Sequence, residues 1–187
     1  MKRILPLIVL PMLPAAAFAH PGHIGHAAPF AEGWAHPLGG TDHVLAMVAV
    51  GLWAAMAADR RGIWALPLAF VAAMLAGGAL GAAGLPLPAV EPMILASSVV
   101  LGLAAALALR PSLALALPAV AVFGVMHGHA HGAEGPAAGL PAYAAGFVLA
   151  TAALHLAGIG LGRLGPGVAR FLGGATALAG AALAVMP

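Results

Sequence analysis

The sequence has no cysteine, which excludes disulfide bonds, thiolate metal sites, iron–sulfur clusters and thiol catalysis. Charge is also scarce: Asp, Glu, Lys and Arg make up 6% of the 187 residues, against about 25% in a typical soluble domain. Hydrophobic residues account for 63% of the chain. This composition predicts an integral membrane protein, and any metal site in it must use nitrogen and oxygen ligands.

The first residues have the layout of a secretory signal peptide. Lys2 and Arg3 precede a short apolar run that ends in the small residues Ala17 and Ala19. We expect residues 1–19 to be removed, with an uncleaved anchor helix as the less favoured alternative because three prolines interrupt the run. Cleavage would leave five basic and five acidic residues, so no basic excess indicates nucleic-acid binding.

The rest of the chain divides into a polar segment and an apolar region. Residues 20–40 lack helical periodicity and predict an extended, histidine-containing periplasmic arm. Residues 41–187 predict an all-α, six-helix transmembrane bundle. Its apolar segments span residues 41–58, 62–83, 91–109, 112–127, 142–162 and 168–185.

The few charges give this bundle an orientation. After residues 1–19, every Lys or Arg falls in a connection that follows the first, third or fifth apolar segment, or within three residues of it, and four of the five acidic residues fall on the opposite side. Basic connections stay in the cytoplasm. We therefore predict a multi-pass protein of the bacterial inner membrane, with its mature N-terminus and its C-terminus in the periplasm.

Pairs of glycines recur at spacing four within two of the apolar segments. They are Gly77 and Gly81 in one, and Gly158 and Gly162 in the other. Small residues at this spacing allow the backbones of two membrane helices to approach closely. They predict tight helix packing.

Nine histidines are the unusual feature of so apolar a chain, and the first cluster is HPLGGTDH. His36 stands before a turn-forming Pro and Gly stretch, and Asp42 and His43 stand at the start of the first apolar segment. Imidazole and carboxylate groups suit Ni²⁺, Co²⁺, Zn²⁺ or Cu²⁺, and the turn would let His36 fold back over the helix start. Alternatively, Asp42 or Thr41 is a plain N-cap.

The second cluster is MHGHAHGAE, at the end of the fourth apolar segment. If the helix continues, His127 and His131 lie on the same face at spacing four, where two imidazoles can grip one metal ion, and Glu134 could close the site. His129 is a secondary candidate. The alternative is a histidine-rich loop that binds metal weakly. Because both clusters lie on one side of the membrane, we favour a shared or relayed site.

Other residues are weaker candidates for metal binding. His155 lies deep in the fifth apolar segment and is either a second station on a metal path or a hydrogen-bonded packing residue, with Thr151 as one partner. His20 and His23 belong either to a capture device or to a solvated tail. Glu91 is either a further ligand or a helix cap.

Both histidine clusters resemble the signature regions of the HupE/UreJ family. These are bacterial accessory membrane proteins associated with hydrogenase and urease gene clusters, regarded as nickel permeases and in some members cobalt permeases. The first signature matches at His36, Asp42 and His43. Met126 stands where the family usually has an aromatic residue, and His129 stands at a variable position. The second signature matches at His127, Gly128, Ala130, His131, Gly132 and Glu134.

This resemblance implies uptake of a divalent metal, most simply Ni²⁺, from periplasm to cytoplasm for hydrogenase or urease maturation. The expected partners are the lipid bilayer and the transported cation. No prosthetic group, catalysis or nucleotide-binding motif is expected. The alternatives are a Co²⁺ permease, a metal-binding or sensor protein without transport, and an intramembrane metalloenzyme, although the chain has no HExxH motif. The implied metal ligands are His36, Asp42, His43, His127, His131 and Glu134.

Overall fold

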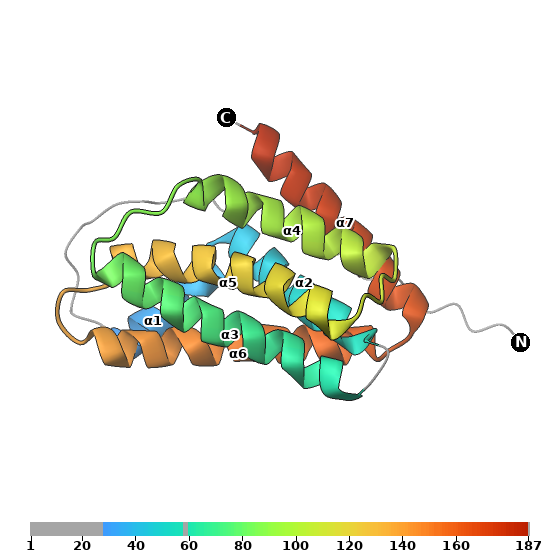
Figure 1. The fold of residues 1–187 in the computed structure, drawn as a ribbon, viewed down its shortest axis with the longest axis horizontal. Coiled ribbons are helices and arrows are strands. Elements are labelled where there is room, and N and C mark those ends of the chain that lie inside the picture. Colours follow the sequence, from blue (N-terminus) through green and yellow to red (C-terminus); the bar gives the residue numbers. More distant parts are fainter. Residues whose placement is uncertain (1–27, 58–59, 187) are drawn as a thin grey trace, which may run out of the picture.

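The computed structural model describes residues 28–57 and 60–186, so the predicted signal peptide and the candidates His20 and His23 lie outside the described residues. The described part of the chain is all-α, without strands. Figure 1 shows the arrangement of its helices. They are α1 (Pro29–Gly39), α2 (Thr41–Ala55), α3 (Arg60–Ala82), α4 (Val90–Ala106), α5 (Leu113–Glu134), α6 (Leu140–Gly162) and α7 (Pro166–Val185).

Each of the six predicted apolar segments overlaps one of the helices α2 to α7. By length and composition, α3, α5, α6 and α7 can each cross a membrane. Helices α1 and α2 together form one further candidate span, broken by a bend of 84°, and α4 is a shorter apolar helix. The described part of the chain therefore confirms the all-α class, and its four to five candidate spans indicate a multi-pass membrane protein, whereas the six-span count stays a prediction.

The prediction of an extended arm over residues 20–40 is wrong in its second half, which forms α1. Pro29 occupies the first turn of α1, where a missing N–H is tolerated. The helix packs tightly on α6: Gly33 lies directly against the Tyr143 backbone, and Gly146 of α6 lies against the α1 backbone in return. A Cβ atom at either glycine would collide with the facing backbone, so the two helices cross in close contact.

Helices α3 and α5 run side by side along their length (Figure 1). Gly77 lies against the Val125 backbone and Gly81 against the His129 backbone, which confirms the close approach predicted from their spacing. The predicted end of this segment at residue 127 is wrong, because α5 continues to Glu134. The extension keeps His127 and His131 of the second cluster on one helix face.

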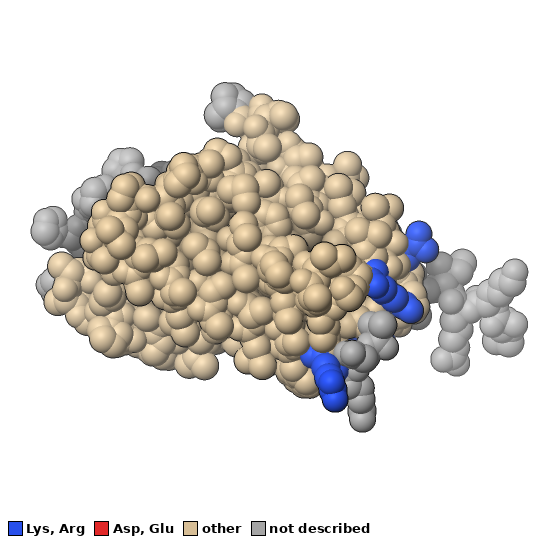
Figure 2. Space-filling view, in the orientation of Figure 1, with Lys and Arg blue, Asp and Glu red and all other residues tan. Residues whose placement is uncertain are grey.

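The surface of the bundle suits a membrane. Large apolar side chains are exposed along its flanks, including Leu68, Leu115, Leu149, Phe171 and Leu178. The two ends differ. The α4–α5 and α6–α7 connections lie at the right-hand end in Figure 1, which we call the basic end because Figure 2 shows the Lys and Arg side chains of the visible face gathered there. The α3–α4 and α5–α6 connections lie at the opposite end, which we call the histidine end.

Candidate metal site

The sharp corner between α1 and α2 brings the residues of the first cluster together. His36 lies in the last turn of α1, and Asp42 and His43 lie in the first turn of α2. The corner is formed by Gly40, where a Cβ atom would lie only 2.8 Å from His43 Nδ1 and 3.0 Å from Asp42 Oδ1. Glycine at this position therefore lets the backbone close over both side chains. Helix α2 has no side-chain cap hydrogen bond, so the N-cap alternative for Asp42 is not found.

Three imidazoles meet beneath this corner. His43 of α2 faces His127 and His131 of α5, with ring centroids 4.8 Å and 4.5 Å away respectively. One ring nitrogen from each residue lies within 4.8 Å of the others. Two nitrogens that share one ion at about 2.1 Å lie at most about 4.2 Å apart, so a small inward rotation of the rings gives ligand geometry. His127 and His131 are buried, whereas His43 is partly buried. We call these three residues the buried triad.

Asp42 fixes the tautomer of His43. The carboxylate Oδ1 accepts one hydrogen bond from His43 Nδ1 at 2.9 Å and one from the His43 backbone N–H at 3.0 Å. Because an ionised carboxylate can only accept, the ring proton is on Nδ1. The lone pair of Nε2 is then free, and this buried atom has no hydrogen-bond partner within the described residues. A carboxylate behind an imidazole is the usual support for a metal-ligating histidine.

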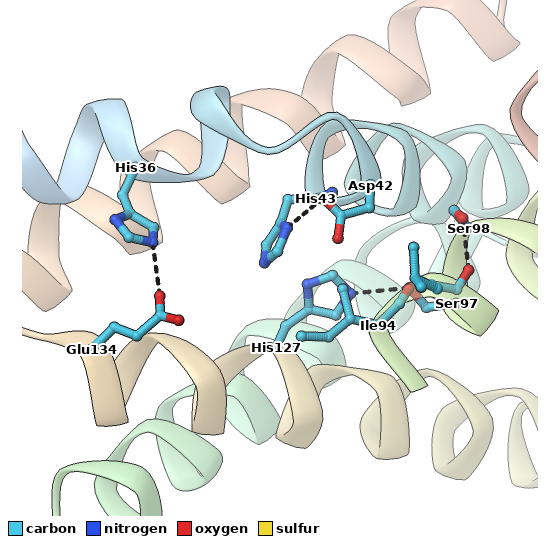
Figure 3. A network of polar contacts seen from close by, with 9 residues as sticks. His36, Asp42, His43, Ile94, Ser97, Ser98, His127 and Glu134 are labelled. Atoms are coloured by element: carbon cyan, nitrogen blue, oxygen red, sulfur yellow. Dashed lines mark hydrogen bonds and ion pairs between the residues drawn. The ribbon is translucent and has the colours of Figure 1, made fainter. Parts of the chain in front are cut away.

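Ser97 of α4 fixes the tautomer of His127 in the same way (Figure 3). Its hydroxyl donates to the Ile94 carbonyl oxygen, and its oxygen lies 3.0 Å from His127 Nε2. The single hydroxyl proton is used on Ile94, so His127 Nε2 must donate and Nδ1 has the free lone pair. In the described structure, His127 Nδ1 and both nitrogens of His131 are buried without a partner. Buried polar atoms of this kind are rare unless a ligand occupies the site.

A second group of ligands overlaps the buried triad. His36 Nε2 lies 3.5 Å from Glu134 Oε2, and the His36 ring contacts the His131 ring with centroids 4.6 Å apart. The three residues can offer ligand atoms within 4.8 Å of one another. The side chains of His36 and Glu134 are 35% and 60% exposed, so this group, which we call the open group, faces the outside. His131 belongs to both groups.

The open group lines a cavity of about 510 Å³ at the histidine end. Its acidic and imidazole lining residues are Glu32, His36, His43, Glu91, His131 and Glu134. Glu91 was predicted as a ligand or a cap. Helix α4 has no side-chain cap hydrogen bond, and the structure places Glu91 in the cavity wall. Glu32 was missed because its segment was not recognised as a helix. The spacing of four between Glu32 and His36 was the available signal.

The remaining predicted residues lie away from the ligand groups. Asp42 supports His43 rather than contributing to either group. His129 is half-buried, and its Nε2 is 2.7 Å from the Leu85 carbonyl oxygen of the α3–α4 connection. His155 is buried in α6, and its predicted hydrogen bond to Thr151 is absent. Ser97, which had no local sequence signal, supports the site from a helix that neither signature includes.

Comparisons with known proteins match the chain to a described family. The family described as HupE / UreJ protein matches residues 8–186 of the chain. Protein HupE of Rhizobium leguminosarum bv. viciae is 45% identical over 124 residues, which cover 66% of this chain and 63% of that relative. The matched region therefore spans less than two thirds of the length of the relative. No solved structure matches the chain.

Proposed function

Since the chain belongs to the HupE/UreJ family, we propose that it moves a divalent transition metal from the periplasm to the cytoplasm, with Ni²⁺ as the expected cargo and Co²⁺ as the alternative. The family is associated with nickel or cobalt uptake for hydrogenase or urease, and it is not a known enzyme family. The single observation that carries the proposal is the convergence of three imidazoles with free nitrogens in the buried triad.

The donor set supports a borderline transition metal. Imidazole nitrogen suits Ni²⁺, Co²⁺, Zn²⁺ and Cu²⁺, whereas Mg²⁺ and Ca²⁺ prefer sites made only of oxygen ligands. The chain has no thiolate that would favour softer ions. The triad contains no carboxylate, so the carboxylates in the cavity wall supply the attraction that concentrates a divalent cation at its mouth.

The overlap of the two ligand groups supports a stepwise route. A hydrated ion first meets the open group, where exposure keeps the cost of losing water low. It then passes to the buried triad, where imidazoles replace more of its hydration shell. His131 takes part in both steps, so it hands the ion from one group to the other. Transport requires binding that is firm enough to select and weak enough to release.

The arrangement of charges supports the direction. We place the basic end in the cytoplasm by the positive-inside rule, which puts the cavity in the periplasm. The broken pair α1 and α2 then counts as one span and α4 as a short one. With α3, α5, α6 and α7 this gives six spans, with both ends of the mature chain in the periplasm.

The test is metal flux into sealed proteoliposomes that contain a metal-sensitive dye, with Ni²⁺, Co²⁺ and Zn²⁺ offered separately. We expect Ni²⁺ flux in the wild type, loss of flux to background in His131→Ala, and nearly unchanged flux in His129→Ala. The last substitution is a matched control on the same helix, outside both ligand groups. Tight Ni²⁺ binding without flux would contradict transport and make the protein a metal receptor.

A further inference from the structure

His155 is a buried histidine that the route described above does not use. It is 1% exposed in the middle of α6, and neither ring nitrogen has a hydrogen-bond partner within the described part of the chain. The candidate partner one turn earlier, Thr151, instead points its hydroxyl at Met74 Sδ, 3.7 Å away. A neutral imidazole always carries one N–H donor and one lone pair. Two buried ring nitrogens without a hydrogen-bond partner are therefore unusual, and a bound ligand would account for them.

The position of His155 links it to the proposed metal route. Helix α6 has a buried stripe at spacing four, formed by Tyr143, Phe147, Thr151 and His155. The half of the stripe nearer the histidine end touches the ligand groups: the Tyr143 ring lies 5.8 Å from the His36 ring, and the Phe147 ring lies 4.2 Å from the His131 ring. The other half, formed by Thr151 and His155, continues towards the basic end.

A single aromatic ring separates His155 from the buried triad. The Phe70 ring of α3 lies 5.4 Å from the His127 ring and 5.2 Å from the His155 ring, which it meets edge-on at 90°. Phe70 is fully buried. An ion that leaves the triad inward therefore meets a phenyl ring first and a free imidazole directly beyond it.

Two further groups that can ligate a metal ion lie one helical turn from His155, towards the histidine end. Met74 follows Phe70 by four residues on α3, and Thr151 precedes His155 by four on α6, so the Met74 thioether and the Thr151 hydroxyl share one level of the interior. Both side chains are buried. Imidazole, hydroxyl and thioether are neutral donors that together suit a borderline to soft transition metal.

Building on the proposed function, we propose that His155 is a second and deeper station for the transported cation, reached when the Phe70 ring turns aside, with Met74 and Thr151 as further ligands one helical turn nearer the histidine end. Without a carboxylate, this station holds a divalent ion less tightly than the triad, whose His43 is backed by Asp42. A weaker second station lets the ion advance and leave, as multi-site conduction requires. The ring of Phe70 makes the transfer a separate step.

The first test counts and identifies the ligands. Full-length protein in lipid nanodiscs is loaded with Ni²⁺ and examined by equilibrium dialysis and by X-ray absorption at the nickel edge. We expect two ions for each wild-type chain and one for His155→Leu. Because the chain has no cysteine, a sulfur scatterer that appears only with the second ion must come from methionine. It should vanish in Met74→Leu and persist in Met47→Leu, a change at another fully buried methionine. One ion for each wild-type chain overturns the proposal.

The second test separates this inference from the proposed function. In proteoliposomes we expect His155→Leu to lower Ni²⁺ flux at least about tenfold while the first ion binds within about twofold of the wild-type affinity. Wild-type flux in His155→Leu, with His131→Ala inactive, overturns the second station and leaves the transport proposal standing. Absence of flux in the wild type overturns transport itself, and the ion count then decides the station alone. If His155→Leu does not fold, His155→Gln takes its place, with the same expected loss of the second ion.

Discussion

The two ligand groups that share His131 differ in burial and in support. In the buried triad, the second nitrogens of His43 and His127 are held by a carboxylate and a hydroxyl respectively. In the open group, His36 and Glu134 contact each other at 3.5 Å and are 35% and 60% exposed. Two of the three imidazoles of the buried triad are therefore held before any ion arrives, whereas His36 and Glu134 of the open group can reorient in water.

This difference indicates a division of labour. Ligands that are preorganised by second-layer hydrogen bonds lose little freedom when they bind, so we expect the triad to determine affinity and selectivity. Exposed carboxylate and imidazole groups can bind and release an ion easily, so they affect the association rate of the ion. Substitutions in the triad should therefore change equilibrium binding, whereas substitutions in the open group should change rates.

The largest effect is expected for His127→Ala. It removes one of three imidazoles at a buried position, and we expect Ni²⁺ affinity to fall by more than about 100-fold, beyond the 10–100-fold typical of losing a supporting residue. Isothermal titration calorimetry measures the affinity, and proteoliposome flux should drop to background. His129→Ala is the control, because that side chain bonds the Leu85 carbonyl and not the site. If His127→Ala binds nickel within threefold of the wild type, the triad is not the binding site.

A smaller effect is expected for Ser97→Ala, which keeps all three ligands. Without the hydroxyl, His127 Nε2 has no partner in the described structure, and the ring can adopt either tautomer and turn. We expect nickel affinity to fall about tenfold, the lower end for a supporting residue. Ser98→Ala is the matched control: Ser98 is also buried on α4 and donates to the Leu95 carbonyl, but it faces Gly180 of α7. Equal losses in the two variants would mean that packing of α4, and not support of the imidazole, causes the effect.

A rate effect is expected for His36→Ala. The triad stays intact, so equilibrium affinity should change by no more than about threefold, whereas the association rate should fall about fivefold because the first ligand on the route is lost. Stopped-flow mixing with Ni²⁺ separates the two quantities. A large loss of affinity with an unchanged association rate would reverse the roles assigned to the two groups.

The sequence was sufficient to predict that most residues of these two groups lie together. The spacing of His127 and His131 depends only on helix periodicity, and the glycine-rich turn before Asp42 and His43 indicated that His36 folds back. Helix periodicity acts over one or two turns, so local patterns of this kind can be read without a structure. The close approach of α3 to α5 at Gly77 and Gly81 was predictable from the sequence for the same reason.

What the sequence could not provide depends on contacts between distant segments. Ser97 meets His127 across 30 residues, and nothing near Ser97 marks it as a support. Asp42 has the same residue type whether it binds an ion or holds an imidazole, so only geometry separates these roles. Helix α1 was missed because its glycines and prolines disfavour a helix locally, and its packing on α6 overrides that preference.

The smallest effect is expected for Glu32→Gln, which tests whether the cavity wall attracts ions at all. Glu32 lines the cavity on α1, one turn before His36, but belongs to neither ligand group. Removing one of the wall carboxylates should lower the Ni²⁺ association rate about twofold at low ionic strength and leave affinity unchanged, because the charge acts at a distance. At about 0.5 M inert salt the difference should disappear, since the screening length falls below about 5 Å. A loss that persists in high salt would instead place Glu32 in direct contact with the ion and enlarge the open group to four ligands.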